Sequence, residues 1–299
     1  MTAAVESSIQ VGEPSSAVTR SQQFASAFDG YRSEIDAHND RRERLIKTSR
    51  DVTNLSKKLI FHLHRMPPPT PTAANDPPRQ PTKMEKEAQS KIDEIVNIVK
   101  RVAYEEDLDR IGQQCIRYER NLGGGLEEFI EAISFHHFLL HGKLITLEEV
   151  QDLFIISPST SIVGSNGQPL TIPATFLFPV PSHRYLLGIS DLTGELMRFA
   201  TNALGGGGGK GTSDPASVVR SVLSLLREIR EALEPFTFLV QDMRKKQAVT
   251  TQSLRKIEDL SYQLSIRTSE FGGDEKAVRE MLRRALEGGS GPSRDDEDE

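Results

Sequence analysis

The chain has 299 residues, of which 36% are hydrophobic, 27% charged and 6% aromatic, and its formal net charge is −6. This charge excludes a protein that binds nucleic acid through an excess of basic residues, so any contact with a polyanion needs a local basic patch, a cation or a more basic partner. The single cysteine, Cys115, excludes an intramolecular disulfide and a cysteine zinc site. With no recognisable signal peptide and no apolar run near the roughly 20 residues of a membrane helix, we expect a cytosolic or nuclear chain that avoids membranes.

The first expected element is a very long helix that starts at Phe24. Residues 1–20 show no periodicity and are expected to be disordered. A helix of about 40 residues, roughly 60 Å long, then extends to the proline-rich segment 66–83, which is expected to be a mobile loop. Its mostly apolar stripe has a seven-residue spacing and consists of Phe24, Tyr31, His38, Leu45, Val52 and Leu59, with Phe28, Ile35 and Leu63 interleaved.

A second helical pattern continues from Ile92 to Leu122, and the three glycines at 123–125 are interpreted as its stop. A third helix is expected from Leu126 to about His141. The sequence TLEE at 146–149 is a capping box that predicts a short helix. Residues 157–182 are expected to form a loop with the little strand character that the chain contains.

The C-terminal half is predicted to be helical with clear interruptions. A helix is expected from about Ser182 to Leu204, followed by a glycine-rich linker at 205–213. The remaining expected features are an Asp214–Pro215 helix start, a break at Glu234–Pro235, a helix that ends at 271–273, a short amphipathic piece at 274–287 and an acidic tail at 288–299. We therefore predict an all-α bundle of about seven helices, with one domain spanning residues 21–287.

Two of these helices carry pairs of acidic residues on one face. Glu128 and Glu131 are three residues apart, and Asp191 and Glu195 are four apart within an apolar stretch. If the two helices face each other, four carboxylates form an oxygen-rich site of the kind that Mg²⁺ and Mn²⁺ prefer. Gly188, one turn before Asp191, leaves room there for a ligand or a close helix.

A simpler interpretation of these acidic pairs is surface decoration, or for the second pair an ion pair with Arg198. Glu127 is interpreted as a surface residue, because it points to another side of the helical wheel.

Other motifs give little support for catalysis. The histidines at 62, 64, 136 and 137 are interpreted as structural or surface residues, since none has the E-x-x-H spacing of a di-iron bundle or the H-E-x-x-H spacing of a zinc site. Cys115 falls on an apolar stripe and is expected in the core. The glycine run lacks the preceding strand and the spacing of a phosphate-binding loop.

Three segments resemble the translin family, in particular its translin-associated factor X (TRAX) branch. They are 43-ERLIKTSRDVTNLSKKLIFHLHR-65, 125-GLEEFIEAISFHHFL-139 and 185-YLLGISDLTGELMR-198, and the resemblance extends over about residues 24 to 272. It implies a seven-helix fold and assembly with translin into a closed, octameric hetero-oligomer. The proline-rich segment and the glycine run depart from the family as insertions at helix junctions.

The resemblance also implies a Mg²⁺-dependent endoribonuclease, with Mn²⁺ as an alternative ion, that acts on single-stranded or nicked RNA. The expected substrates are passenger-strand fragments in RNA silencing and tRNA-precursor fragments, in the cytoplasm and nucleus. The motif positions that carry over as catalytic and metal-binding residues are Glu128, Glu131, Asp191 and Glu195. Proximity in sequence adds candidate RNA contacts at Arg117, Arg120, Arg184 and Arg198.

A hypothesis of a different class makes the chain a non-catalytic helical scaffold or nucleic-acid-binding partner of translin, with its carboxylates bound to arginines. Because the net charge is −6, we also expect the chain alone to bind RNA weakly and its partner to supply much of the basic surface.

Overall fold

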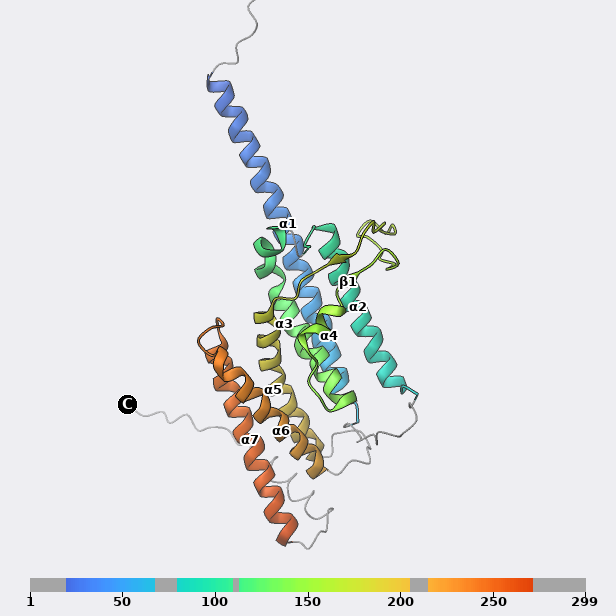
Figure 1. Cartoon of the computed structure of the whole chain (residues 1–299), viewed down its shortest axis with the longest axis vertical. Helices are drawn as coiled ribbons and strands as arrows, with labels where there is room; N and C mark the ends of the chain where they lie inside the picture. The colour runs from blue at the N-terminus through green and yellow to red at the C-terminus, as the bar shows by residue number, and fades with distance from the viewer. Residues whose placement is uncertain (1–19, 68–79, 110–112, 205–214, 271–299) are drawn as a thin grey trace, which may run out of the picture. The chain divides into compact units, whose positions relative to one another are not determined.

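A computed structural model of the chain describes residues 20–67, 80–109, 113–204 and 215–270 (Figure 1). The expected disordered ends, the amphipathic piece at 274–287, most of the proline-rich loop, the glycine-rich linker and the Asp214 helix cap lie outside these residues. Contacts between Cα atoms divide the chain into two units, Met1–Arg44 and Leu45–Glu299. None of the described helices has the length and apolar character needed to cross a membrane.

The long first helix is confirmed as α1, which spans Arg20–Leu63 and has 44 residues. It contributes differently to the two units. In the first unit the stripe residues Phe24, Phe28, Tyr31 and Ile35 are exposed. In the second unit the same stripe is buried in the core at Leu45, Val52, Leu59 and Leu63.

The second and third helices differ from the prediction at their boundary. The pattern expected to run unbroken from Ile92 to Leu122 is divided between α2, Lys83–Glu105, and α3, Gln113–His141. Helix α2 begins with a Thr82 capping box, and Asp107, just beyond its end, has a φ of 54°. The glycines at 123–125 do not stop a helix but lie inside α3. Glycine costs a helix only about 1 kcal/mol per residue, which close packing against neighbours can offset.

A short helix and a small ribbon follow α3. The capping box at Thr146 is confirmed, and it opens α4, Leu147–Asp152. Strand β1, Ile155–Ile156, pairs antiparallel with β2, Phe176–Leu177, so that Ile155 lies opposite Leu177. Within the predicted loop, Ile162 and Ile172 form a second, small apolar cluster with Ile156, whereas Phe178 and Val180 belong to the main core.

The C-terminal helices pack around α5. This helix spans Ser182–Leu204, as predicted, and contacts α3, α6 and α7 (Figure 1). Helix α6, Pro215–Leu233, ends at the predicted break, where Glu234–Phe236 form the 3₁₀ helix η1. Helix α7 spans Met243–Glu270. The described part of the chain therefore has seven α-helices and confirms the all-α class.

Candidate functional site

Close packing of α5 on α3 brings the two acidic segments together. A Cβ atom placed on Gly188 of α5 would lie 2.8 Å from the Glu127 carbonyl oxygen and 2.8 Å from the Ile130 Cβ atom of α3. The space that Gly188 leaves is thus filled by a close helix. The pairs Glu128/Glu131 and Asp191/Glu195 follow on the two helices, so the predicted juxtaposition of the acidic segments is present.

The carboxylates on these helices influence one another's ionisation. Glu131 is 9% exposed, and its burial, reinforced by the nearby carboxylates of Asp191, Glu128 and Glu195, raises its pKa to about 8. Burial also raises the pKa of Glu128, helped by Asp191 and Glu195 and opposed by Lys57. Burial raises the pKa of Asp191 against the opposing effect of Lys246. The site therefore holds more negative charge than its surroundings stabilise.

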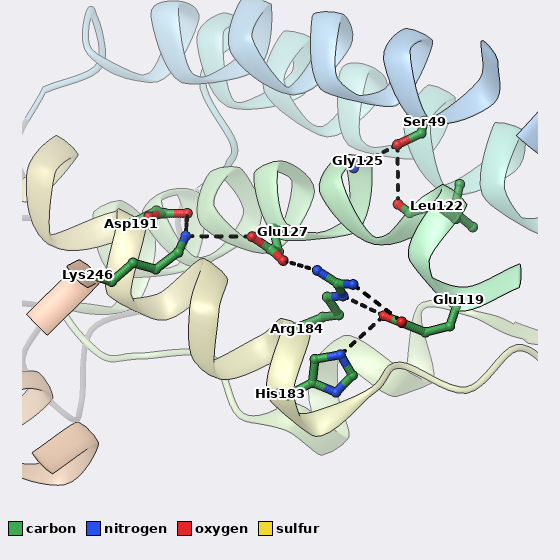
Figure 2. A network of polar contacts seen from close by, with 9 residues as sticks. All are labelled: Ser49, Glu119, Leu122, Gly125, Glu127, His183, Arg184, Asp191 and Lys246. Carbon is green, nitrogen blue, oxygen red and sulfur yellow. Dashed lines mark hydrogen bonds and ion pairs between the residues drawn. The ribbon is translucent and has the colours of Figure 1, made fainter. Parts of the chain in front are cut away.

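Basic side chains contact most of these carboxylates. Lys246 of α7 forms an ion pair with Asp191, and its Nζ atom lies 3.6 Å from Glu127 Oε2 (Figure 2). His64, directly after α1, places Nε2 2.5 Å from Glu195 Oε2. The remaining pairs are Arg198 Nη1 to Glu195 Oε1 at 3.2 Å and Lys57 Nζ to Glu128 Oε2 at 4.0 Å. Within the described ranges, Glu131 forms no ion pair.

A second network, next to this site, is centred on Arg184 at the start of α5. Its guanidinium binds Glu119 and places Nη1 2.5 Å from Glu127 Oε1 (Figure 2). His183 Nε2 lies 3.2 Å from Glu119 Oε1. Burial opposes ionisation of Glu119, but the hydrogen bond and charge of Arg184 outweigh it and lower the pKa of Glu119. Gly123 makes space for this arginine, because a Cβ atom there would lie 2.5 Å from Arg184 Cζ.

The four arginines expected to contact RNA thus lie in different environments. Arg184 is only 18% exposed and is held by two glutamates. Arg117 and Arg120 are exposed on the first turns of α3. Arg198 is 62% exposed and remains paired with Glu195. Three of the four therefore present charge to solvent next to the acidic helices.

Two properties decide whether the site fits a metal ion: the chemistry of its donor atoms and the arrangement of its side chains in this structure. The donors are carboxylate oxygens, which suit Mg²⁺ or Mn²⁺, and Glu131 is a buried acid whose charge lacks compensation. Across the residues that the structure describes, however, no group of three or more His, Cys, Asp or Glu side chains converges closely enough to hold a metal ion. The chemistry fits, while Asp191 and Glu195 now point to Lys246 and His64.

Comparison with known proteins identifies the family. The model of the translin family matches residues 40–268. The chain belongs to the translin family. It is 32% identical to mouse Translin-associated protein X over 253 residues, which cover 82% of this chain and 79% of the relative. The Translin-associated protein X homolog of Schizosaccharomyces pombe is 22% identical over 249 residues, covering 81% of this chain and 89% of the relative. These relatives place the chain in the translin-associated factor X branch.

Two solved structures share the translin fold. The crystal structure of apo-NeC3PO superposes with a TM-score of 0.54 at 17% identity, covering 79% of this chain and 95% of the other. The crystal structure of AfC3PO gives a TM-score of 0.50 at 18% identity, with coverages of 78% and 94%. At these identities the likeness shows the fold alone. The family match includes all four predicted carboxylates on α3 and α5.

Sequence reasoning missed the partners of the translin-family carboxylates. Glu127 was interpreted as a surface residue, yet it is largely buried and ion-paired with Arg184 and Lys246. The interpretation of His64 as structural or surface did not name its partners, which are Glu195 and, at a ring-centroid distance of 4.9 Å, Phe135. Lys246 was not considered. The signal that could have raised suspicion was the apolar surroundings of Asp191, which required a cation from elsewhere.

Proposed function

We propose that this chain is the catalytic subunit of a complex with translin that cleaves single-stranded or nicked RNA in the presence of Mg²⁺ or Mn²⁺. The names of its relatives, Translin-associated protein X, support a translin partner. The observation that carries the catalytic part is the environment of Glu131, a buried acid among three other carboxylates whose pKa is raised to about 8. Acids that share a poorly compensated charge are typical of sites that bind a cation or move a proton.

In this proposal Glu128, Glu131, Asp191 and Glu195 would hold the divalent ion. When bound, such an ion supplies charge stabilisation for a phosphodiester and activates a water molecule. The chain's own residues prepare the site. Lys246 opposes the effect of burial on the pKa of Asp191, and His64 and Arg198 both contact the Glu195 carboxylate. Glu131 carries a proton at neutral pH while no cation compensates its charge.

RNA contacts would come from the exposed arginines beside the acidic helices, Arg117, Arg120 and Arg198. Arg184 is also proposed as an RNA contact. Its guanidinium is already bound to Glu119 and Glu127, so it would contact RNA while it keeps these ion pairs. Passenger-strand and tRNA-precursor fragments are the proposed substrates, and the cytoplasm and nucleus the proposed locations. We further propose an octameric complex, which a mass measurement in solution would check.

The test is cleavage of a single-stranded RNA by the chain combined with translin, in Mg²⁺ and in chelator. Glu128→Gln and Asp191→Asn should abolish cleavage while the complex still forms, because each removes one charged oxygen donor. Glu94→Gln on the exposed side of α2 is the matched control and should cleave like the wild type. Undiminished cleavage by either site variant would refute the catalytic proposal.

The ion pairs of the site favour a second candidate function, a non-catalytic scaffold. Lys246 and Arg198 form ion pairs with Asp191 and Glu195, and His64 contacts Glu195, as the scaffold hypothesis requires, although two of the three are not arginines. A scaffold predicts that Mg²⁺ leaves thermal unfolding unchanged. The nuclease proposal predicts a Mg²⁺-dependent rise in the unfolding temperature that Glu131→Gln reduces, because ligand binding stabilises the folded state.

A further inference from the structure

The exposed face of α1 in the second unit is strongly basic, although the chain carries a net charge of −6. Exposed residues recur there at spacings of three or four and lie on one side of the helix. We call these residues the basic stripe: Lys47, Arg50, Asn54, Lys57, Phe61 and Arg65. Lys58 lies beside it, and Asp51 is the acidic residue on its border.

The charges of the basic stripe are largely available. Lys57 reaches Glu128 at 4.0 Å, which is a long contact for a side chain that is mostly exposed. Lys47, Arg50 and Arg65 form no ion pair with any residue that the structure describes. Phe61 is 71% exposed, an unusual position for a phenylalanine in the middle of a charged face. Cations along a line with an exposed aromatic ring are the pattern that binds single-stranded nucleic acid.

A surface hollow connects the basic stripe to the acidic site. It is lined by Ser49, Arg50, Thr53 and Asn54 of α1 and by Gly124 and Glu128 of α3. A Cβ atom on Gly124 would meet nothing within 4 Å, so this glycine leaves the hollow open. The next residue, Gly125, lets α1 approach α3 closely, since a Cβ atom there would lie 2.7 Å from the Ser49 carbonyl oxygen.

We propose that the basic stripe is the path along which an RNA strand reaches Glu128. Lys47, Arg50 and Lys57 would bind successive phosphates, and Phe61 would stack on a base. Lys47 and Phe61 are about 21 Å apart along α1 at 1.5 Å per residue, enough for several nucleotides. The hollow beside Arg50 and Asn54 then directs the strand toward Glu128. This inference rests on the proposed function, because it names the substrate path of the same site.

The experiment measures binding of a fluorescent single-stranded RNA to the full chain combined with translin, in chelator so that no cleavage occurs. The variant Lys47→Gln/Arg50→Gln/Lys57→Gln removes three charges from the stripe. The control Lys86→Gln/Arg255→Gln/Lys256→Gln removes three exposed charges from α2 and α7. Each phosphate contact on a single strand contributes about 0.7 to the slope of log affinity against log salt. The slope of the stripe variant should therefore be smaller than that of the wild type by about 2. Between 50 and 200 mM salt, the affinity of the stripe variant should then fall by a factor roughly 20 times smaller than that of the wild type. The control should keep the wild-type slope.

Phe61 gives an independent measurement. Phe61→Ala should weaken binding about 5- to 150-fold without changing the salt slope, because stacking contributes roughly 1–3 kcal/mol per base. Phe61→Tyr, which keeps the ring, should restore binding.

The two proposals fail in distinguishable ways. If the stripe variant and its control bind RNA with equal slopes, the path is wrong, whether or not the wild type cleaves. If the stripe variant no longer assembles with translin, the stripe is a protein interface and the proposal is overturned. If the wild type binds RNA through the stripe but never cleaves it with Mg²⁺ or Mn²⁺, the path stands and the nuclease proposal fails.

Discussion

The glycines of α3 and α5 allow a direct test of how the site is assembled. Gly124 and Gly194 have open space where a Cβ atom would lie, whereas Gly125 and Gly188 face atoms 2.7 and 2.8 Å away. All four lie inside helices, so an alanine gains the same helix propensity at each. Differences among the four alanine variants therefore report packing at the helix crossings rather than backbone preference.

The expected magnitudes follow from these distances. Gly124→Ala and Gly194→Ala should raise the free energy of unfolding by about 0.5–1 kcal/mol. At Gly125 the colliding atom is the Ser49 backbone carbonyl, so α1 must move, and the hydrogen bond from Gly125 N to Ser49 Oγ at 3.0 Å weakens. Overpacking costs about 1–3 kcal/mol and the hydrogen bond about 1 kcal/mol. After the gain in helix propensity, Gly125→Ala should be about 1–3 kcal/mol less stable than the wild type.

Urea unfolding of the four variants measures these differences, with equal slopes confirming a comparison of the same two states. Gly125→Ala should unfold at lower urea than the wild type and Gly124→Ala at higher urea. If Gly125→Ala unfolds at the same urea concentration as Gly124→Ala, the close approach of α1 and α3 does not depend on glycine. The explanation of why three glycines occur within α3 would then be refuted.

Three further predictions concern charge. Glu131 has a pKa of about 8 in the folded chain against 4.5 normally, so the folded state keeps a proton that the unfolded state releases. The free energy of unfolding should therefore fall by about 1.4 kcal/mol per pH unit as the pH rises between these two values. In urea unfolding at pH 5.5, 7 and 8.5, Glu131→Gln should remove this fall. His136 is buried, and its pKa is lowered to about 4 from 6.5, so the unfolded state binds a proton that the folded state does not. The free energy of unfolding should therefore decrease as the pH falls from 6.5 to 4. His136→Leu should make this decrease smaller. Lys246→Met should lower the unfolding temperature, because Asp191 loses its cation, and Mg²⁺ should restore part of the loss in a thermal scan.

Most of the fold could be predicted because its signals are local. The capping box at Thr146, the break at Pro235 and the bounds of α5 depend on residues within one or two turns. The glycines at 123–125 could not be interpreted in this way. Whether a glycine ends a helix or permits close packing depends on the neighbouring helix, here on Ser49, more than 70 residues earlier in the chain.

In the candidate site, too, local features could be predicted and distant contacts could not. Spacing within α3 and α5 was enough to predict which carboxylates share a face, because helical geometry fixes it. The cations could not be predicted from spacing. Lys246 is 55 residues from Asp191, and His64 is 131 residues from Glu195. Only the packing of α7 and α1 against the acidic helices brings these side chains to the carboxylates.

These distant contacts also explain how several carboxylates can lie close together in the folded chain. Lys246 and Lys57 offset charge on Asp191 and Glu128, and His64 contacts Glu195, so these contacts are divided among three carboxylates. Glu131 lies among the same carboxylates but receives no ion pair within the described residues, and its raised pKa shows that it stays protonated instead. The proton on Glu131 therefore removes a negative charge that no neighbouring cation offsets. A divalent ion that binds there must release this proton and compete with Lys246 for Asp191, so its affinity should rise with pH up to about 8.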